Sequence, residues 1–173
     1  MPFTPFHMGA ALISKPLCNS HLSLITFGIA QIIMDLEPGI GMLTGAAVLH
    51  GPTHTILGAI GIAFFVALIS PLICSSFLRK LNKELKHYRL HWLIQSEQLL
   101  KRDVIFSAFF GTLSHVALDS LLHADIRPLA PFSHVNPLFG LVSHDGVYQL
   151  CTIAGVVGFF VWMFLIWSRK NAS

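Results

Sequence analysis

The sequence predicts an all-α fold: a polytopic membrane helical bundle with three full spans and an N-terminal re-entrant or short helical hairpin. Of its 173 residues, 54% are hydrophobic and only 11% are charged, whereas a soluble domain carries about 25% charged residues. The apolar residues fall in long uncharged runs, and the mean hydropathy is +0.69. One compact bundle accommodates a chain of this length, so residues 1–173 are expected to form a single membrane-embedded domain.

The first part of the chain predicts the hairpin. Residues 21–34 form an apolar run that ends at the motif Asp-Leu-Glu-Pro. Its length of about 14 residues is more typical of a buried or re-entrant helix than of a full span. A shorter helix is expected before it and should end at Pro16, because proline disfavours helical geometry at the preceding residue. A hairpin over residues 6–35 would bring His7 and Asp35 to its open end.

The rest of the chain predicts the three spans. Residues 53–73, 104–122 and 147–167 hold no charged residue other than Asp119. Each run has about 20 residues, the length that crosses the hydrocarbon core of a bilayer as a helix. The glycine-rich run 39–47, ahead of the first span, is expected to be a flexible connection or a closely packed turn.

The basic residues predict the orientation of these spans. Seven Lys and Arg lie within residues 79–102, between the first two spans, and Arg169 and Lys170 follow the last span. The positive-inside rule places both regions in the cytoplasm, for a multi-pass protein of the inner (plasma) membrane. Residues 77–102 have helical spacing of leucines and a basic face, so they lie on the membrane surface or extend the spans. The loop 124–146 is then non-cytoplasmic.

Three polar side chains share one face of the second span. His115, Asp119 and His123 are four residues apart, and a step of four residues advances about 40° around a helix. Along the helix, these three side chains follow one another toward its non-cytoplasmic end. One interpretation is a polar seam that hydrogen-bonds to another helix. The other is a functional site, which is the default hypothesis for ionisable residues inside a membrane span.

Two further pairs of polar residues should reach the same end. In the motif His-Gly-Pro-Thr-His, Pro52 suits the first turn of a helix, with His50 just outside it and His54 inside it. Imidazoles at this spacing are common ligands of Zn²⁺, Mn²⁺ or Fe²⁺. The alternative is a pair of interfacial histidines that hydrogen-bond to helix ends. Asp35 and Glu37 end the early apolar helix, where a solvated helix end is the alternative.

The charge balance favours metal binding. Residues 16–78 and 103–126 contain no Lys or Arg, and Arg127 is the one fixed cation expected on the outer side after Lys15. Buried carboxylates without a partner cost several kcal/mol each or become protonated, whereas divalent cations would neutralise them directly. The carboxylates concerned are Asp35, Glu37, Asp119 and Asp125.

Several short motifs carry a family resemblance. In order along the chain they are Phe-His at 6–7, Asp-Leu-Glu at 35–37, His-x-x-x-His-Thr at 50–55, His-x-x-x-Asp at 115–119 and PLAPFS at 128–133. Together they resemble the motifs of bacterial membrane-bound proteins classed as metal-dependent hydrolases, a group that includes the LexA-binding, inner-membrane-associated hydrolases. The resemblance implies a metal site and marks His7 as a further ligand. The expected metal ligands are His7, Asp35, His50, His54, His115 and Asp119.

We therefore expect a membrane-embedded metal-dependent hydrolase that acts at the non-cytoplasmic membrane edge on a small, lipid-linked or phosphoester substrate. One or two Zn, Mn or Fe ions would lower the pKa of a water molecule and polarise a substrate oxygen. Glu37 would accept the proton of that water or bridge two ions, and Arg127 would hold an anionic group such as phosphate.

Two alternatives come from other classes of protein. An ion or proton transporter also places polar residues inside spans. A non-catalytic membrane partner would use its basic segment 77–102 to bind a cytoplasmic protein or anionic lipid. The net charge of +3 gives no indication of nucleic-acid binding.

Overall fold

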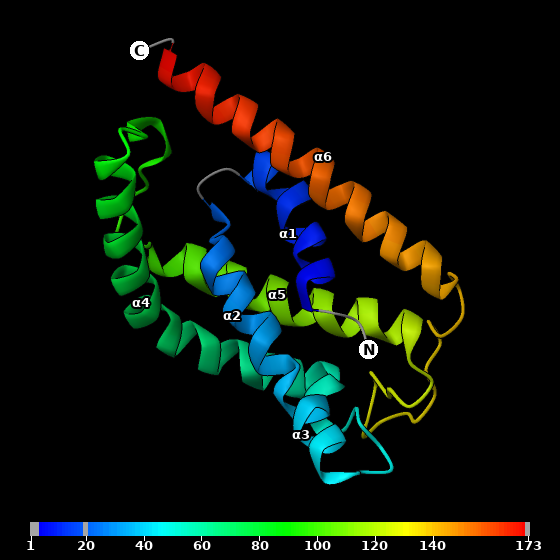
Figure 1. Ribbon diagram of the computed structural model, residues 1–173. Coiled ribbons are helices and arrows are strands. Elements are labelled where there is room, and N and C mark those ends of the chain that lie inside the picture. Colours follow the sequence, from blue (N-terminus) through cyan, green and yellow to red (C-terminus); the bar gives the residue numbers. More distant parts are fainter. Residues whose placement is uncertain (1–3, 19–20, 172–173) are drawn as a thin grey trace.

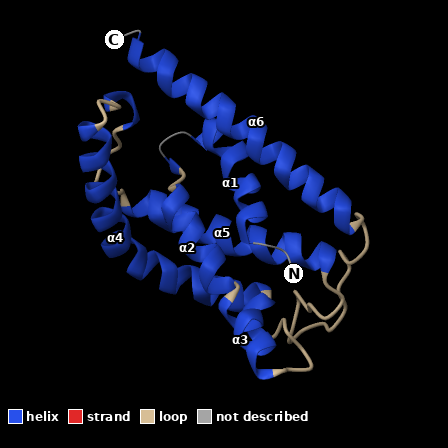
Figure 2. Cartoon of the chain, viewed as in Figure 1, coloured by secondary structure: helices blue, strands red, loops and turns tan. Residues whose placement is uncertain are grey.

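The structure, a computed structural model that describes residues 4–18 and 21–171, confirms the all-helical membrane bundle (Figure 1). Within these residues there is no strand (Figure 2). The α-helices are α1 (Thr4–Cys18), α2 (Leu24–Met34), α3 (Leu36–Thr44), α4 (Ile56–His87), α5 (Lys101–Leu122) and α6 (His144–Asn171), and the short 3₁₀ helices are η2 (Pro52–His54) and η3 (His91–Leu93).

Four helical segments are long and apolar enough to cross a membrane. Three of them, in α4, α5 and α6, correspond to the predicted spans, although α4 begins at Ile56 and leaves residues 53–55 outside the helix. The fourth joins α2 and α3 over Leu24–Thr44, because Asp35 keeps helical backbone angles of φ −75° and ψ −7°. The prediction of a flexible connection or a closely packed turn from Gly39 was therefore wrong as far as Thr44, where the chain is helical. The helix ends at Gly45, whose φ of +71° is the left-handed geometry that glycine adopts readily.

The predicted hairpin corresponds to α1 and α2, which run in opposite directions (Figure 1). His7 lies in the first turn of α1, and Asp35 directly follows the last residue of α2, so both lie at the same end of the bundle. α1 continues through Pro16 to Cys18 and does not stop before the proline. The hairpin therefore delivers two of the predicted ligands to one place.

α1 is held against α6 by a very close approach of the two backbones. A Cβ on Gly158 would overlap the backbone carbonyl of Leu12, and one on Gly9 would overlap the carbonyl oxygen of Cys151. Small residues allow helices to pack this closely in membranes, where van der Waals contact drives association. This packing fixes the position of His7 near the start of α1.

α5 is the central helix of the bundle. Half of the residues in its most apolar 18-residue stretch are buried inside the protein. The corresponding share is 22% in α4 and 17% in α6. Its buried face contacts α2 and α4, whereas α4 and α6 expose large side chains such as Phe64, Leu68 and Phe160. These exposed faces match the lipid of a bilayer, so the polar residues on α5 are shielded from it.

α4 extends well beyond its predicted span. It bends along its length (Figure 1), and Pro71 lies in its middle, where proline removes a helical hydrogen bond. The last turns of α4 carry four of the basic residues of segment 79–102. They lie at the opposite end of the bundle from the loops that follow α3 and α5 (Figure 1).

Candidate metal centre

The α5 helix places two ionisable side chains one turn apart in the interior. His115 and Asp119 are both fully buried, and His115 Nε2 lies 3.2 Å from Asp119 Oδ2. Asp35, at the junction of α2 and α3, approaches the same imidazole, with Oδ1 3.4 Å from His115 Nε2. The face that the four-residue spacing predicts on α5 therefore points into the bundle and not to lipid.

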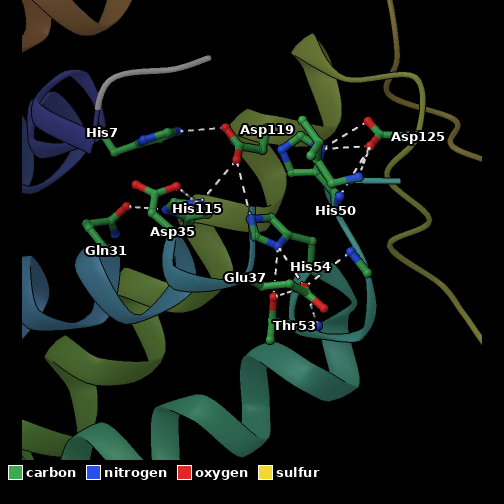
Figure 3. Close-up of polar contacts among 12 residues, drawn as sticks. His7, Gln31, Asp35, Glu37, His50, Thr53, His54, His115, Asp119 and Asp125 are labelled. Atoms are coloured by element: carbon green, nitrogen blue, oxygen red, sulfur yellow. Dashed lines mark hydrogen bonds and ion pairs between the residues drawn. The ribbon is translucent and has the colours of Figure 1, made fainter. Parts of the chain in front are cut away.

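His54 completes this group from a different segment. It ends the short helix η2, which begins at Pro52, and its Nε2 lies 3.6 Å from Asp119 Oδ2. Asp35, His54, His115 and Asp119 each offer one ligand atom, and these atoms all lie within 4.8 Å of one another (Figure 3). We call these residues the four-residue cluster.

His7 lies beside the four-residue cluster. Its Nε2 is 3.1 Å from Asp119 Oδ1, and its ring stacks on that of His115 with centroids 4.5 Å apart. It therefore approaches the carboxylate oxygen that His54 and His115 do not face. The structure brings His7 into contact with the predicted site but not among the four converging ligand atoms.

Several of these atoms have no hydrogen bond. His54 Nε2, His115 Nε2 and both carboxylate oxygens of Asp119 are buried and, in the part of the chain that the structure describes, lack a hydrogen-bond partner. The two imidazole nitrogens lie 3.6 Å and 3.2 Å from Asp119 Oδ2, but the angles at these contacts do not fit hydrogen bonds. Buried polar groups are almost always hydrogen-bonded, and each one left without a partner costs about 1–3 kcal/mol. A cation between the two imidazole nitrogens and Asp119 Oδ2 would give these three atoms a partner.

A glutamine sets the tautomer of His115. Gln31 is fully buried on α2, and its Nε2 donates to the carbonyl of Gly111 at 2.8 Å. That bond orients the amide so that Gln31 Oε1 lies 2.7 Å from His115 Nδ1, which must donate the proton. Neutral His115 therefore turns a lone pair on Nε2 toward Asp35 and Asp119, the arrangement of a metal-binding imidazole.

A threonine sets the tautomer of His54 in the same way. The hydroxyl of Thr53 donates to Glu37 Oε2, so it accepts from His54 Nδ1 at 2.9 Å. Glu37 Oε2 also accepts the backbone N–H groups of Gly51 and Thr53, each at 3.1 Å. Neutral His54 thus directs its Nε2 lone pair to Asp119 (Figure 3). Glu37 lies behind the ring of His54, 3.6 Å from Nδ1, and not among the ligand atoms.

The structure separates His50 from His54. Their rings meet edge to face with centroids 4.9 Å apart, yet His50 Nδ1 points to Asp125, 3.0 Å from each carboxylate oxygen. His50 also stacks on His123, at 4.3 Å between centroids. We call His50, His123 and Asp125 the three-residue cluster, because each offers a ligand atom within 4.8 Å of the others. The sequence predicted a single group with His50 in it and did not single out Asp125 as a ligand.

The charges of the three-residue cluster follow from its contacts. Burial acts to raise the pKa of Asp125, but hydrogen bonds from the His50 side chain and from the backbone of His50 and Leu49 outweigh it and hold that pKa below its usual value. Burial and the neighbouring His50 lower the pKa of His123. The cluster therefore combines a carboxylate with a neutral imidazole, the forms that bind metals.

A pocket of about 640 Å³ opens beside the three-residue cluster. His50 and Asp125 form part of its wall, together with Arg127, His134 and apolar residues such as Val48. Arg127 is exposed there and lies apart from the four-residue cluster. At the other end of the bundle His21 pairs with Asp103 at 2.9 Å, outside both clusters.

Comparison with known proteins identifies the family. A family model described as YdjM inner membrane protein matches residues 39–172, well over half of the chain, and covers α4, α5 and α6. No curated protein and no solved structure matches the chain. The match and the four apolar helical segments make the protein a multi-pass inner membrane protein. The family description gives a location and no reaction. The chain belongs to the YdjM inner membrane protein family.

Proposed function

We propose that this protein is a membrane-embedded metal-dependent hydrolase whose metal ion binds to the four-residue cluster. One observation carries the proposal: Nε2 of His54 and Nε2 of His115 face Asp119 Oδ2 at 3.6 Å and 3.2 Å without hydrogen-bond geometry, while the Nδ1 atom of each ring is engaged by Thr53 or Gln31. Acceptor atoms that face each other at 3.2–3.6 Å repel one another unless a cation lies between them. Two imidazoles and two carboxylates suit Zn²⁺, Mn²⁺ or Fe²⁺.

The chemistry of such a site follows from its ligands and their supports. A divalent ion supplies a Lewis acid that lowers the pKa of water and polarises a substrate oxygen. The protein's own part is to hold the imidazoles, through Gln31 on His115 and through Thr53 and Glu37 on His54. We assign Glu37 this positioning role because its Oε2 already accepts three hydrogen bonds.

The pocket supports an amphiphilic substrate. Arg127 supplies a fixed positive charge near His50 and Asp125, and the remaining wall is largely apolar, with Val48, Leu57 and others. A guanidinium pairs well with a phosphate, and apolar walls accommodate a lipid-linked group. By the positive-inside rule this end of the bundle is non-cytoplasmic. We therefore propose a lipid-linked or phosphoester substrate at that membrane edge.

Ion or proton transport is the second candidate, because buried polar residues recur along the buried face of α5. Asp103, Ser107 and Thr112 continue the row of His115 and Asp119 toward the opposite end. A packed apolar cluster lies beside this row, however, and α5 carries no ionisable side chain between Asp103 and His115. The cluster consists of Ala30, Ala63, Val66 and Ala108, all fully buried. This gap between ionisable side chains favours hydrolysis over transport.

The substitution Asp119→Asn tests the metal site. It keeps the shape of the side chain but removes the negative charge that faces three imidazoles. The protein is purified in detergent after growth with added metals, and metal content is measured by mass spectrometry. We expect bound metal in the wild type and in the control His21→Gln, whose partner Asp103 lies far from the cluster. Asp119→Asn should lose this metal.

A second measurement tests the reaction. A chromogenic phosphoester with an alkyl tail is supplied in mixed micelles, and hydrolysis is followed with and without a chelator. Activity that requires metal and is lost in Asp119→Asn supports the proposal. A wild type without metal, or equal metal content in wild type and Asp119→Asn, would refute it.

A further inference from the structure

We infer that the protein holds a second divalent cation, bound by the three-residue cluster of His50, His123 and Asp125. The first ion uses Asp35, His54, His115 and Asp119, so the two sites share no ligand. The second site therefore goes beyond the proposed function, and either site can be wrong without the other.

The first argument is an unpaired buried atom. His123 Nε2 is shielded from solvent and has no hydrogen-bond partner among the described residues. Asp125 already accepts from the side chain of His50 and from the backbone of His50 and Leu49, but it does not pair with His123. Hydrogen bonding thus accounts for His50 and Asp125 but leaves Nε2 of His123 without a hydrogen-bond partner. One cation near all three residues would complete the cluster.

The second argument is that the loop carrying these residues is held in place. Asn136 Nδ2 donates to the carbonyls of Ser120 at 2.9 Å and of His123 at 3.1 Å, which fixes the end of α5. Ile126 is fully buried next to Asp125, and the Pro128 carbonyl accepts from Ile56 N at the start of α4. A cluster on such supports keeps its geometry, as ligands that bind a metal must.

The third argument is position. His50 meets His54 edge to face at 4.9 Å between centroids, so the two clusters are neighbours. His50 and Asp125 also form the wall of the pocket that contains Arg127. The side chain of Asp125 is 35% exposed, which leaves room for water or a ligand oxygen beside the ion. If the proposed function holds, an anionic substrate group would meet Arg127 and the second ion before the first.

Metal stoichiometry tests this inference. The full chain is purified in detergent, stripped with a chelator and titrated with Zn²⁺ alone against a fluorescent competitor. We expect two equivalents in the wild type and one in Asp125→Asn. His123→Gln should also bind one equivalent, and it leaves the contact between His50 and Asp125 intact. Asp145→Asn, an exposed carboxylate at the start of α6, is the matched control and should bind two.

The outcomes separate this site from the first one. Asp119→Asn should keep one equivalent, held by the three-residue cluster. Loss of one equivalent in Asp125→Asn and His123→Gln, with none lost in Asp119→Asn, would support the second site and overturn the first. A single equivalent in the wild type that survives in both Asp125→Asn and His123→Gln would overturn the second site.

Discussion

The hydrogen bond from His115 to Gln31 makes a sharp prediction about metal affinity. Replacing Gln31 by Met keeps an unbranched side chain of similar length but removes the acceptor for His115 Nδ1, now at 2.7 Å, and the donor to the Gly111 carbonyl. His115 is then free to move its proton to Nε2, the atom that faces Asp35 and Asp119. We therefore expect Gln31→Met to bind Zn²⁺ more weakly.

The size of the effect distinguishes a tautomer-setting group from an ordinary contact between helices. Removing a hydrogen-bond partner of a metal-bound imidazole typically costs 10- to 100-fold in metal affinity, which is about 1.4–2.8 kcal/mol. An average hydrogen bond between membrane helices is worth about 0.6 kcal/mol, or about threefold. A loss of about tenfold or more is therefore expected from the contacts of Gln31.

The matched variant is Gln31→Glu. It keeps an oxygen that can accept from His115 Nδ1 but places a second oxygen against the Gly111 carbonyl. Both variants should unfold at lower temperature than the wild type. Only Gln31→Met should lose affinity in a Zn²⁺ competition titration, because Gln31→Glu retains the acceptor. Equal affinity in Gln31→Met and the wild type, or equal loss in both variants, would refute the role assigned to Gln31.

Two further predictions concern the support of His54 and the orientation of the bundle. Glu37→Gln should weaken Zn²⁺ binding about tenfold in the same titration, because a neutral amide holds Thr53 and Gly51 less strongly than a carboxylate does. Unchanged affinity would exclude the positioning role. In a background without the three native cysteines, an impermeant maleimide should label Ser133→Cys from the periplasmic side and not Lys86→Cys. The reverse pattern would invert the proposed orientation.

The sequence predicted the spans and one face of the site for definite physical reasons. Uncharged runs of about 20 residues leave few alternatives to a membrane helix. Within a helix the four-residue step fixes relative direction, so the spacing alone places His115 and Asp119 on one face. Because consecutive spans cross the membrane in opposite directions, His54 before the first span and the end of α5 were expected at the same end of the bundle. These features depend on local geometry and on the bilayer alone.

The remaining parts of the site depend on segments where helical periodicity is absent. His123, just after α5, has an extended backbone with φ −117° and ψ 121°, so spacing from Asp119 carries no information about Asp125. His50 and His54 are separated by Gly51, with ψ −140°, and by a 3₁₀ turn, so their rings point to different carboxylates. Neither the division into two clusters nor the position of Glu37 behind His54 could therefore be predicted from spacing.

Protonation of the imidazoles is the main alternative to a metal ion in the four-residue cluster. Doubly protonated His54 and His115 would balance Asp35 and Asp119 in charge. Each protonated imidazole would then donate a charge-assisted hydrogen bond to a carboxylate, for which donor–acceptor separations of about 2.7–2.9 Å are usual. The separations are 3.2 Å and 3.4 Å for His115 and 3.6 Å for His54, and the unpaired atoms do not meet hydrogen-bond geometry. Four ligands at bond lengths of about 2.0–2.1 Å around a tetrahedral ion lie about 3.3 Å from one another. Three of the separations in the cluster lie near that value and all of them lie within 4.8 Å, which favours a metal ion over protons.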